Sequence, residues 1–197
     1  MKTEIEAKFL NVDFDQVRAK LTELGAVCEQ PMRLMRRALI EPEFIRTAGR
    51  DAFIRIRDEG HRVTVTFKEF KKLSLTGAQE REIVVSDFDE TIAIFKESGL
   101  SYRTFQESKR ETWKLGDVEV VLDEWPWLRP YIEVEAPTEA LVESTSEALG
   151  FMWEDAVFGS VDVAYKLQYP HLGGRGVIDV PEVRFGEPVP EHFGKSI

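Results

Sequence analysis

The sequence has very little of the two residue types that bind soft metals. Its 197 residues include one cysteine, Cys28, and three histidines. A single cysteine excludes a disulfide framework within the chain and a cysteine-based zinc site. The histidines stand at positions 61, 171 and 192, a spacing that is not typical of metal ligands. The sequence therefore indicates neither a disulfide-stabilised protein nor a cysteine or histidine metal centre.

Long apolar runs and an excess of positive charge are also missing. No apolar run approaches the roughly 20 residues of a transmembrane helix. The first residues are charged from Lys2 to Glu6, which is unlike a secretory signal peptide. A net charge of −10 argues against nucleic acid or an anionic membrane surface as a partner. We therefore expect a cytoplasmic monomer or homodimer that binds neither DNA nor membranes.

Apolar residues and helix signals are plentiful. Hydrophobic residues make up 43% of the chain, including 13 Phe, which is enough for a packed core. Residues 13–26, 86–100 and 137–151 combine a capping residue, apolar side chains at helical spacing and a final glycine. A shorter helix is predicted over residues 160–168. The chain therefore contains at least three helices around a core.

Strand patterns lie between the helices. Residues with alternating apolar and polar character occupy 4–9, 51–59, 61–69, 78–86, 108–115, 117–124 and 130–137. Strands outnumber the helices, and the helices occur singly between them. This arrangement predicts an α+β fold with an antiparallel sheet.

The last 28 residues differ from the rest of the chain. Residues 170–197 hold four of the nine prolines and five glycines, and no apolar period persists through them. Such a segment is ordered only if it docks on the body of the protein. We predict a main domain over residues 1–169 and a Pro/Gly-rich C-terminal tail over residues 170–197.

The polar faces of several predicted strands carry pairs of like charges, two residues apart. The pairs are Glu4 and Glu6, Arg55 and Arg57, Glu80 and Glu82, and Glu133 and Glu135. Each pair is repulsive unless a counter-ion lies between its members. A divalent metal would neutralise the carboxylates, and an anion such as phosphate would neutralise the arginines.

Two interpretations of these charges remain open. In one, the strands form a barrel with a polar interior that holds a polyphosphate with its metal, and helices cover the outside. In the other, helices cover one face of a sheet and the charges are simply solvated on the other face. Strand periodicity alone does not separate the two.

Several segments resemble one known family. Glu4-Ile5-Glu6-Ala7-Lys8 matches the Glu-x-Glu-x-Lys signature of the CYTH superfamily, the triphosphate tunnel metalloenzymes. Later segments follow in the family's order, from Glu4 to about Tyr165. They are FIRIR, TVTFK, EREI, ESKRETW, VVLDE, YIEVEA and SVDVAYKL.

The resemblance implies an eight-stranded antiparallel closed β-barrel with helices packed outside. It also implies Mg²⁺ or Mn²⁺ as cofactor and a triphosphate-containing small molecule as partner. The implied metal ligands are Glu4, Glu6, Asp123, Glu133 and Glu135. The implied substrate-binding residues are Arg55, Arg57, Lys68, Arg81, Lys109, Arg110 and Tyr165. The EREI segment implies Glu82 together with Arg81, but its register is open, so Glu80 could take the role instead. The implied catalytic residues are Glu6 and Lys8.

Three functions are compatible with this resemblance. The first is hydrolysis of inorganic or organic triphosphate, the second is cyclisation of ATP to cyclic AMP, and the third is binding without catalysis. Retention of both Glu-x-Glu pairs argues against a simple binder. One departure concerns Arg36 and Arg37, which stand where family members often have Asp-x-Tyr. They predict either an extra basic contact or a solvated edge.

Overall fold

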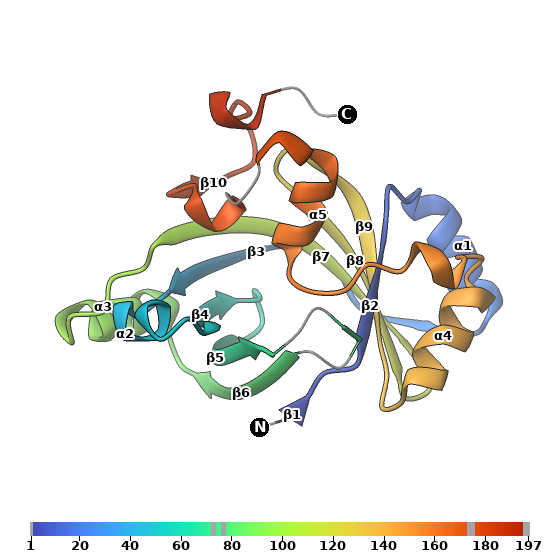
Figure 1. Cartoon of the computed structure of the whole chain (residues 1–197). Coiled ribbons are helices and arrows are strands. Elements are labelled where there is room, and N and C mark those ends of the chain that lie inside the picture. Colours follow the sequence, from blue (N-terminus) through green and yellow to red (C-terminus); the bar gives the residue numbers. More distant parts are fainter. Residues whose placement is uncertain (1, 72–73, 76–77, 173–175, 195–197) are drawn as a thin grey trace.

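A strongly curved sheet forms the centre of the molecule, and the helices lie outside it (Figure 1). The computed structural model describes residues 2–71, 74–75, 78–172 and 176–194. Eight long antiparallel strands are arranged in the order β6-β5-β4-β3-β7-β8-β9-β2. Their bounds are β2 Glu6–Leu10, β3 Val27–Ile40, β4 Asp51–Asp58, β5 Val63–Phe70, β6 Ala78–Val85, β7 Thr104–Leu115, β8 Val118–Trp125 and β9 Leu128–Glu135. The α+β class and the antiparallel sheet are therefore as predicted.

The sheet curls into an open half-barrel whose edges lie 9 Å apart, so the predicted closed barrel is wrong in this respect. The reason lies in the first strand, which changes partner midway. Its short first part, β1 (Lys2–Thr3), pairs with β6, whereas β2 pairs with β9. The backbone N–H of Glu4 donates to the carbonyl of Ala78 over 3.2 Å. The N-terminal segment therefore spans the two edges without a continuous ladder between them.

Five α-helices occur in the described part of the chain. They are α1 Phe14–Glu23, α2 Glu43–Thr47, α3 Phe88–Glu97, α4 Glu139–Ala148 and α5 Val161–Gln168. A capping residue was predicted for three helices, and Asp13, Asp87 and Thr138 accept hydrogen bonds from backbone N–H groups at the starts of α1, α3 and α4. The short helix α2 was not predicted, because five residues show too little periodicity.

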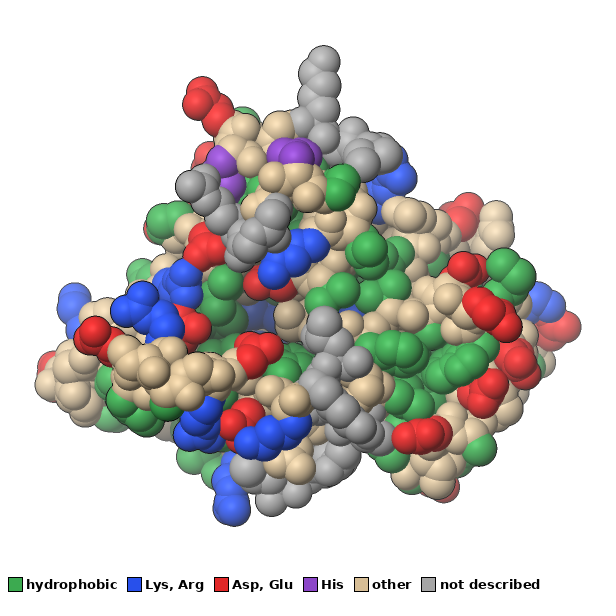
Figure 2. Space-filling view, in the orientation of Figure 1, with side chains coloured by type: hydrophobic (Ala, Val, Ile, Leu, Met, Phe, Trp, Pro, Cys, Tyr) green, Lys and Arg blue, Asp and Glu red, His purple; other side chains and the backbone are tan. Residues whose placement is uncertain are grey.

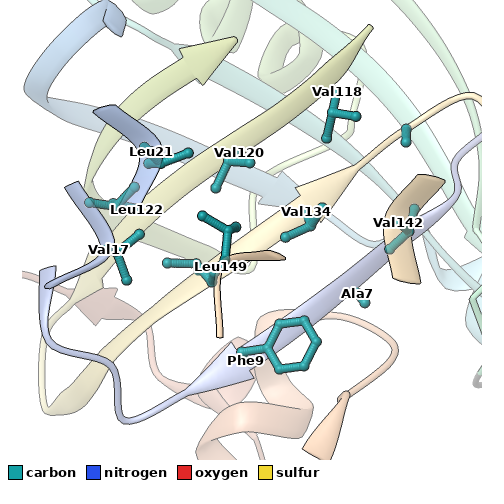
Figure 3. Packing of buried hydrophobic residues seen from close by; sticks show 12 residues of the cluster. Ala7, Phe9, Val17, Leu21, Val118, Val120, Leu122, Val134, Val142 and Leu149 are labelled. Carbon is teal, nitrogen blue, oxygen red and sulfur yellow. The ribbon is translucent and has the colours of Figure 1, made fainter. Parts of the chain in front are cut away.

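Apolar side chains cover the outer face of the sheet, against the helices. Ala7 and Phe9 of β2 belong to a cluster with Val17 of α1 and Val142 of α4 (Figure 3). The alternate residues Glu6 and Lys8 point to the concave face. A second cluster packs α3 on β3 and β4 through Phe88, as predicted for helices outside a polar interior. The two faces of the sheet are therefore apolar outside and charged inside.

The C-terminal segment docks on the end of the sheet. Short 3₁₀ helices at Pro170–Leu172, Val177–Asp179 and Glu191–Phe193 pack with α5 and with the end of β8. The two-residue strand β10 (Glu182–Val183) pairs in parallel with β7. Neither feature was predicted, because isolated apolar side chains hold the segment rather than a repeating pattern.

The outer surface is rich in charge of both signs. Acidic side chains gather toward the side of α1 and α4, whereas Lys and Arg are more frequent toward α2 and α3 (Figure 2). None of the described helices has the length and apolar character needed to cross a membrane.

Candidate functional site

The concave face of the sheet encloses a cavity of about 570 Å³. This volume is in the range of pockets that bind small molecules. Charged side chains dominate its lining. The basic ones are Lys8, Arg37, Arg55, Arg57, Arg62, Lys68, Arg110 and Lys114. The acidic ones are Glu4, Glu6, Glu80, Glu82, Asp117, Glu119, Glu133, Glu135 and Asp162.

Three carboxylates meet where the N-terminal segment joins the two sheet edges. Glu4, Glu6 and Glu135 each place one oxygen so that all three lie within 4.8 Å of one another. Glu6 and Glu135 are brought together because they are directly paired between β2 and β9. An all-oxygen ligand set of this size suits Mg²⁺ or Mn²⁺. The chain's own residues therefore fit the metal that the family pattern implies.

Glu4 also belongs to an acidic pair with Glu80 of β6. Burial and the neighbouring Glu4 raise the pKa of Glu80 to about 7. Burial would raise the pKa of Glu4 as well, but the ion pair with Lys68 holds it below its usual value. Glu4 is therefore ionised at neutral pH. The neighbouring Glu80 is then protonated in part of the molecules.

Lys8 is held between two carboxylates. Its Nζ lies 2.9 Å from Oε1 of Glu6 and 3.2 Å from Oε1 of Glu133, and its side chain is 2% exposed. Burial lowers its pKa, but Glu133 and Glu6 outweigh burial and raise it. The same contact with Lys8 helps to hold the pKa of Glu133 below its usual value despite burial. Lys8 is therefore a fixed cation at neutral pH rather than a proton carrier.

Arg110 of β7 is fixed from two directions. Its Nε donates to Asp123 over 2.7 Å and its Nη2 donates to Glu133 over 2.8 Å. Asp123, a predicted metal ligand, is 1% exposed and does not line the cavity. The structure therefore places Asp123 behind Arg110, where it orients the guanidinium.

Arg55 and Arg57 extend from β4 into the cavity, as expected from their spacing. Arg57 pairs with Glu59, and Nη2 of Arg55 lies 3.8 Å from Oε2 of Glu82. Burial and the adjacent Arg55 lower the pKa of Arg57 to about 9. The Nε atoms of both arginines are buried without a hydrogen-bond acceptor. Crowded, partly unsatisfied guanidinium groups of this kind are well suited to bind an anion.

Nine of the predicted site residues share this cavity. They are Glu4, Glu6, Lys8, Arg55, Arg57, Lys68, Arg110, Glu133 and Glu135. Lys68 comes from β5, opposite Glu80 in the β5–β6 ladder. Their convergence from different strands follows from the alternation of each strand and the curvature of the sheet.

Three further predicted residues lie away from the cavity. Arg81 is exposed, because strand alternation turns Glu80 and Glu82 inward instead. Lys109 places its Nζ 3.3 Å from Glu124 and lies over the ring of Phe185.

Tyr165 of α5 is the third. It is fully buried, and its hydroxyl donates to the carbonyl of Pro126 over 2.6 Å. The structure therefore places Tyr165 in the core beneath the C-terminal segment.

Arg36 and Arg37 were predicted to make either an extra basic contact or a solvated edge, and the structure divides them, while Gln106 and Val177 were missed in the sequence. Arg37 lines the cavity, whereas its neighbour Arg36 lies outside and binds Asp58 over 2.7 Å. Gln106 lines the cavity because β7 begins at Thr104, four residues before the predicted strand. The apolar side chain of Val177 contributes to the cavity wall from the C-terminal segment. The alternation along β3 is the one sequence signal that could have separated Arg37 from Arg36.

Comparison with protein families and solved structures agrees with this architecture. A model of the CYTH domain matches residues 2–152. No curated protein sequence matches the chain. The PH1012 protein from Pyrococcus horikoshii is 23% identical, with a TM-score of 0.66 over 78% of this chain and 93% of its own.

Two other solved structures carry names that refer to an activity. A proposed adenylate cyclase from Vibrio parahaemolyticus is 10% identical, with a TM-score of 0.67 over 81% of this chain and 95% of its own. HpAC1 from Hippeastrum, a proposed adenylyl cyclase described as having a dominant triphosphatase activity, is 16% identical. Its TM-score is 0.54 over 80% of this chain and 91% of its own. At these identities the likeness concerns the fold.

Proposed function

Because the chain belongs to the CYTH domain family, we propose that it is a metal-dependent enzyme that hydrolyses the triphosphate group of a small molecule. One observation carries the proposal. The carboxylates Glu4, Glu6 and Glu135 and the cations Arg55, Arg57 and Lys68 line a single cavity. Phosphoryl transfer requires two kinds of group side by side. Carboxylates hold a divalent cation, and basic side chains hold the phosphate oxygens.

Each group then has a defined role. Glu4, Glu6 and Glu135 would hold Mg²⁺ or Mn²⁺, which neutralises phosphate charge and favours deprotonation of a bound water. Arg55, Arg57, Lys68, Lys8 and Arg110 bind the phosphate oxygens, and the ion pairs of Lys8 and Arg110 with Glu133 fix their positions.

Glu80 lines the cavity beside Glu4, where its carboxylate can take the proton of the attacking water. The reaction breaks the bond between the terminal phosphorus and its bridging oxygen. Water supplies the new oxygen of the released orthophosphate, one of its protons goes to Glu80, and the shortened phosphate chain leaves with the bridging oxygen.

The alternative is an adenylyl cyclase, in which the 3′-hydroxyl of ATP attacks the α-phosphorus and pyrophosphate leaves. The same cavity could hold ATP for that reaction. The dominant triphosphatase activity described for HpAC1 supports hydrolysis as the first choice. A binder without catalysis is the third possibility, and the metal-type carboxylate cluster argues against it.

Product analysis tests the proposal directly. Purified protein is incubated with inorganic triphosphate, thiamine triphosphate or ATP in Mg²⁺ or Mn²⁺, with EDTA as the control. Hydrolysis predicts metal-dependent release of orthophosphate. Cyclic AMP with pyrophosphate would establish the cyclase instead, and the absence of any product would establish the binder.

A further inference from the structure

Within the part of the chain that the structure describes, Arg37 differs from the other cations in the cavity because it has no carboxylate partner. Among the described residues, each of the other seven Lys and Arg side chains that line the cavity forms an ion pair. They are Lys8, Arg55, Arg57, Arg62, Lys68, Arg110 and Lys114. Arg37 is 8% exposed, and its recorded polar contact is a 2.9 Å hydrogen bond from Nη2 to the hydroxyl of Ser108. Burying a charge without a counter-ion is unfavourable in free energy, so an anion bound at this position would stabilise Arg37.

Unsatisfied hydrogen-bond donors surround the same guanidinium. The Nε of Arg37, the Nε2 of Gln106 and the Nε1 of Trp125 are all buried without an acceptor. Arg37 and Gln106 are directly paired between β3 and β7, and the Arg37 guanidinium lies over the Trp125 ring, 4.3 Å from its centroid. All three residues line the cavity. Three strands thus contribute donors to one place, and the described structure offers them no carboxylate.

Arg37 and Arg110 occupy different positions in the cavity. Arg110 is drawn toward Asp123 and Glu133, on the side of the metal-type carboxylates. Trp125 is two residues further along β8 than Asp123, and Arg37 lies against it. Gln106 and Arg110 are four residues apart on β7, or roughly 13 Å at the usual strand rise. Arg37 is also directly paired with Arg57 between β3 and β4, so its position adjoins the Arg57 side of the triphosphate site, at the Trp125 end of the cavity.

We propose that Arg37, Gln106 and Trp125 form an additional phosphate subsite, beyond the groups that hold a triphosphate. This inference rests on the proposed function. A phosphoryl group offers three acceptor oxygens and enough negative charge to compensate Arg37. The buried N–H donors of Gln106 and Trp125, which have no acceptor in the described structure, add to the donors that such a group can use. The favoured ligand is therefore a linear polyphosphate with a fourth phosphate, such as inorganic tetraphosphate.

Isothermal titration in EDTA tests this without turnover. The probes are tripolyphosphate and tetrapolyphosphate, titrated into the wild-type protein, Arg37→Met, Gln106→Leu and the matched control Arg36→Met. Wild type is expected to bind tetrapolyphosphate at least tenfold more tightly than tripolyphosphate. Arg37→Met should abolish that difference and keep tripolyphosphate binding, Gln106→Leu should reduce the difference, and Arg36→Met should retain it.

The opposite results are equally clear. Equal losses of both probes in Arg37→Met would place Arg37 in the triphosphate site and overturn the subsite. Equal binding of both probes by wild type would also overturn it, and would leave the proposed function intact. Binding of neither probe would overturn the subsite, and the product analysis in Mg²⁺ or Mn²⁺ would still decide the proposed function. Thermal unfolding shows whether each variant folds, and Gln106→Leu decides the question if Arg37→Met does not.

Discussion

At the scale of single residues, the acidic pair of Glu4 and Glu80 links pH to stability. Glu80 has a folded-state pKa of about 7, above its ordinary value of 4.5, so its ionisation favours unfolding. This cost is absent below about pH 4.5, grows between pH 4.5 and 7, and is constant above pH 7. Glu80→Gln should therefore raise the Tm of the metal-free protein above pH 7, by roughly 2–4 °C per kcal/mol recovered.

The measurement is thermal unfolding from pH 4.5 to 8 in EDTA. Glu143→Gln on the exposed face of α4 is the control, and it should follow the wild-type curve. If Glu80→Gln unfolds at the wild-type temperature at every pH, the buried acidic pair does not exist in solution.

Glu6 provides a second prediction at this scale, which concerns the metal. Glu6→Gln removes one ligand charge, but the new amide oxygen can still accept from Lys8, which also keeps Glu133. The metal-free fold should survive. The affinity for Mn²⁺ should fall by more than the roughly 10–100-fold that loss of an outer-shell partner costs. Activity should fall with it.

Calorimetric titration with Mn²⁺ measures the affinity, and the unfolding temperature in EDTA measures the fold. Glu143→Gln is again the matched control. A variant that loses stability in EDTA as severely as activity would show that Glu6 is a structural residue rather than a ligand.

At the scale of elements, alternation along each strand was predictable, whereas long-range register was not. In β2 the pattern places Lys8 inside and Phe9 outside, and the structure agrees. In β6 the same rule places Glu80 and Arg81 on opposite faces, yet the family resemblance favoured Arg81. Local sterics fix alternation, so the sequence alone contains it. The meeting of Glu6 with Glu135 depends on the pairing of β2 with β9, which lie far apart in the sequence, and no local pattern specifies it.

The inward and outward arginines of the sheet give a paired prediction. Arg57→Lys keeps the charge but loses the planar fork, so triphosphate affinity should fall about tenfold, the cost of ~1.4 kcal/mol. Arg57→Ala should weaken binding further. Arg81→Lys and Arg81→Ala, on the exposed face of β6, should bind as wild type does. Titration with tripolyphosphate measures all four variants. Loss of affinity in the Arg81 variants, with none in the Arg57 variants, would reverse the assignment of faces.

At the scale of the whole molecule, closure of the sheet and docking of the C-terminal segment escaped prediction. Closure depends on whether β1 and β2 form one strand, and that depends on two different partners, β6 and β9. The C-terminal segment packs through scattered apolar side chains such as Leu172, Val183 and Phe193, which no period reveals. The division into residues 1–169 and 170–197 remains a prediction, although Val177 already contributes to the cavity wall.

The last prediction concerns the attachment of that segment. Phe193 is fully buried, with its ring centroid 5.2 Å from that of Tyr169 and 5.8 Å from that of Tyr165. Phe193→Ala should cost about 3–5 kcal/mol, which lowers Tm on the order of 10 °C. Val189→Ala, at an exposed position of the same segment, is the control and should change Tm little. Because Val177 and Ile178 form part of the cavity wall, Phe193→Ala should also weaken tripolyphosphate binding. Unchanged Tm and binding in Phe193→Ala would show that the segment does not dock on the sheet.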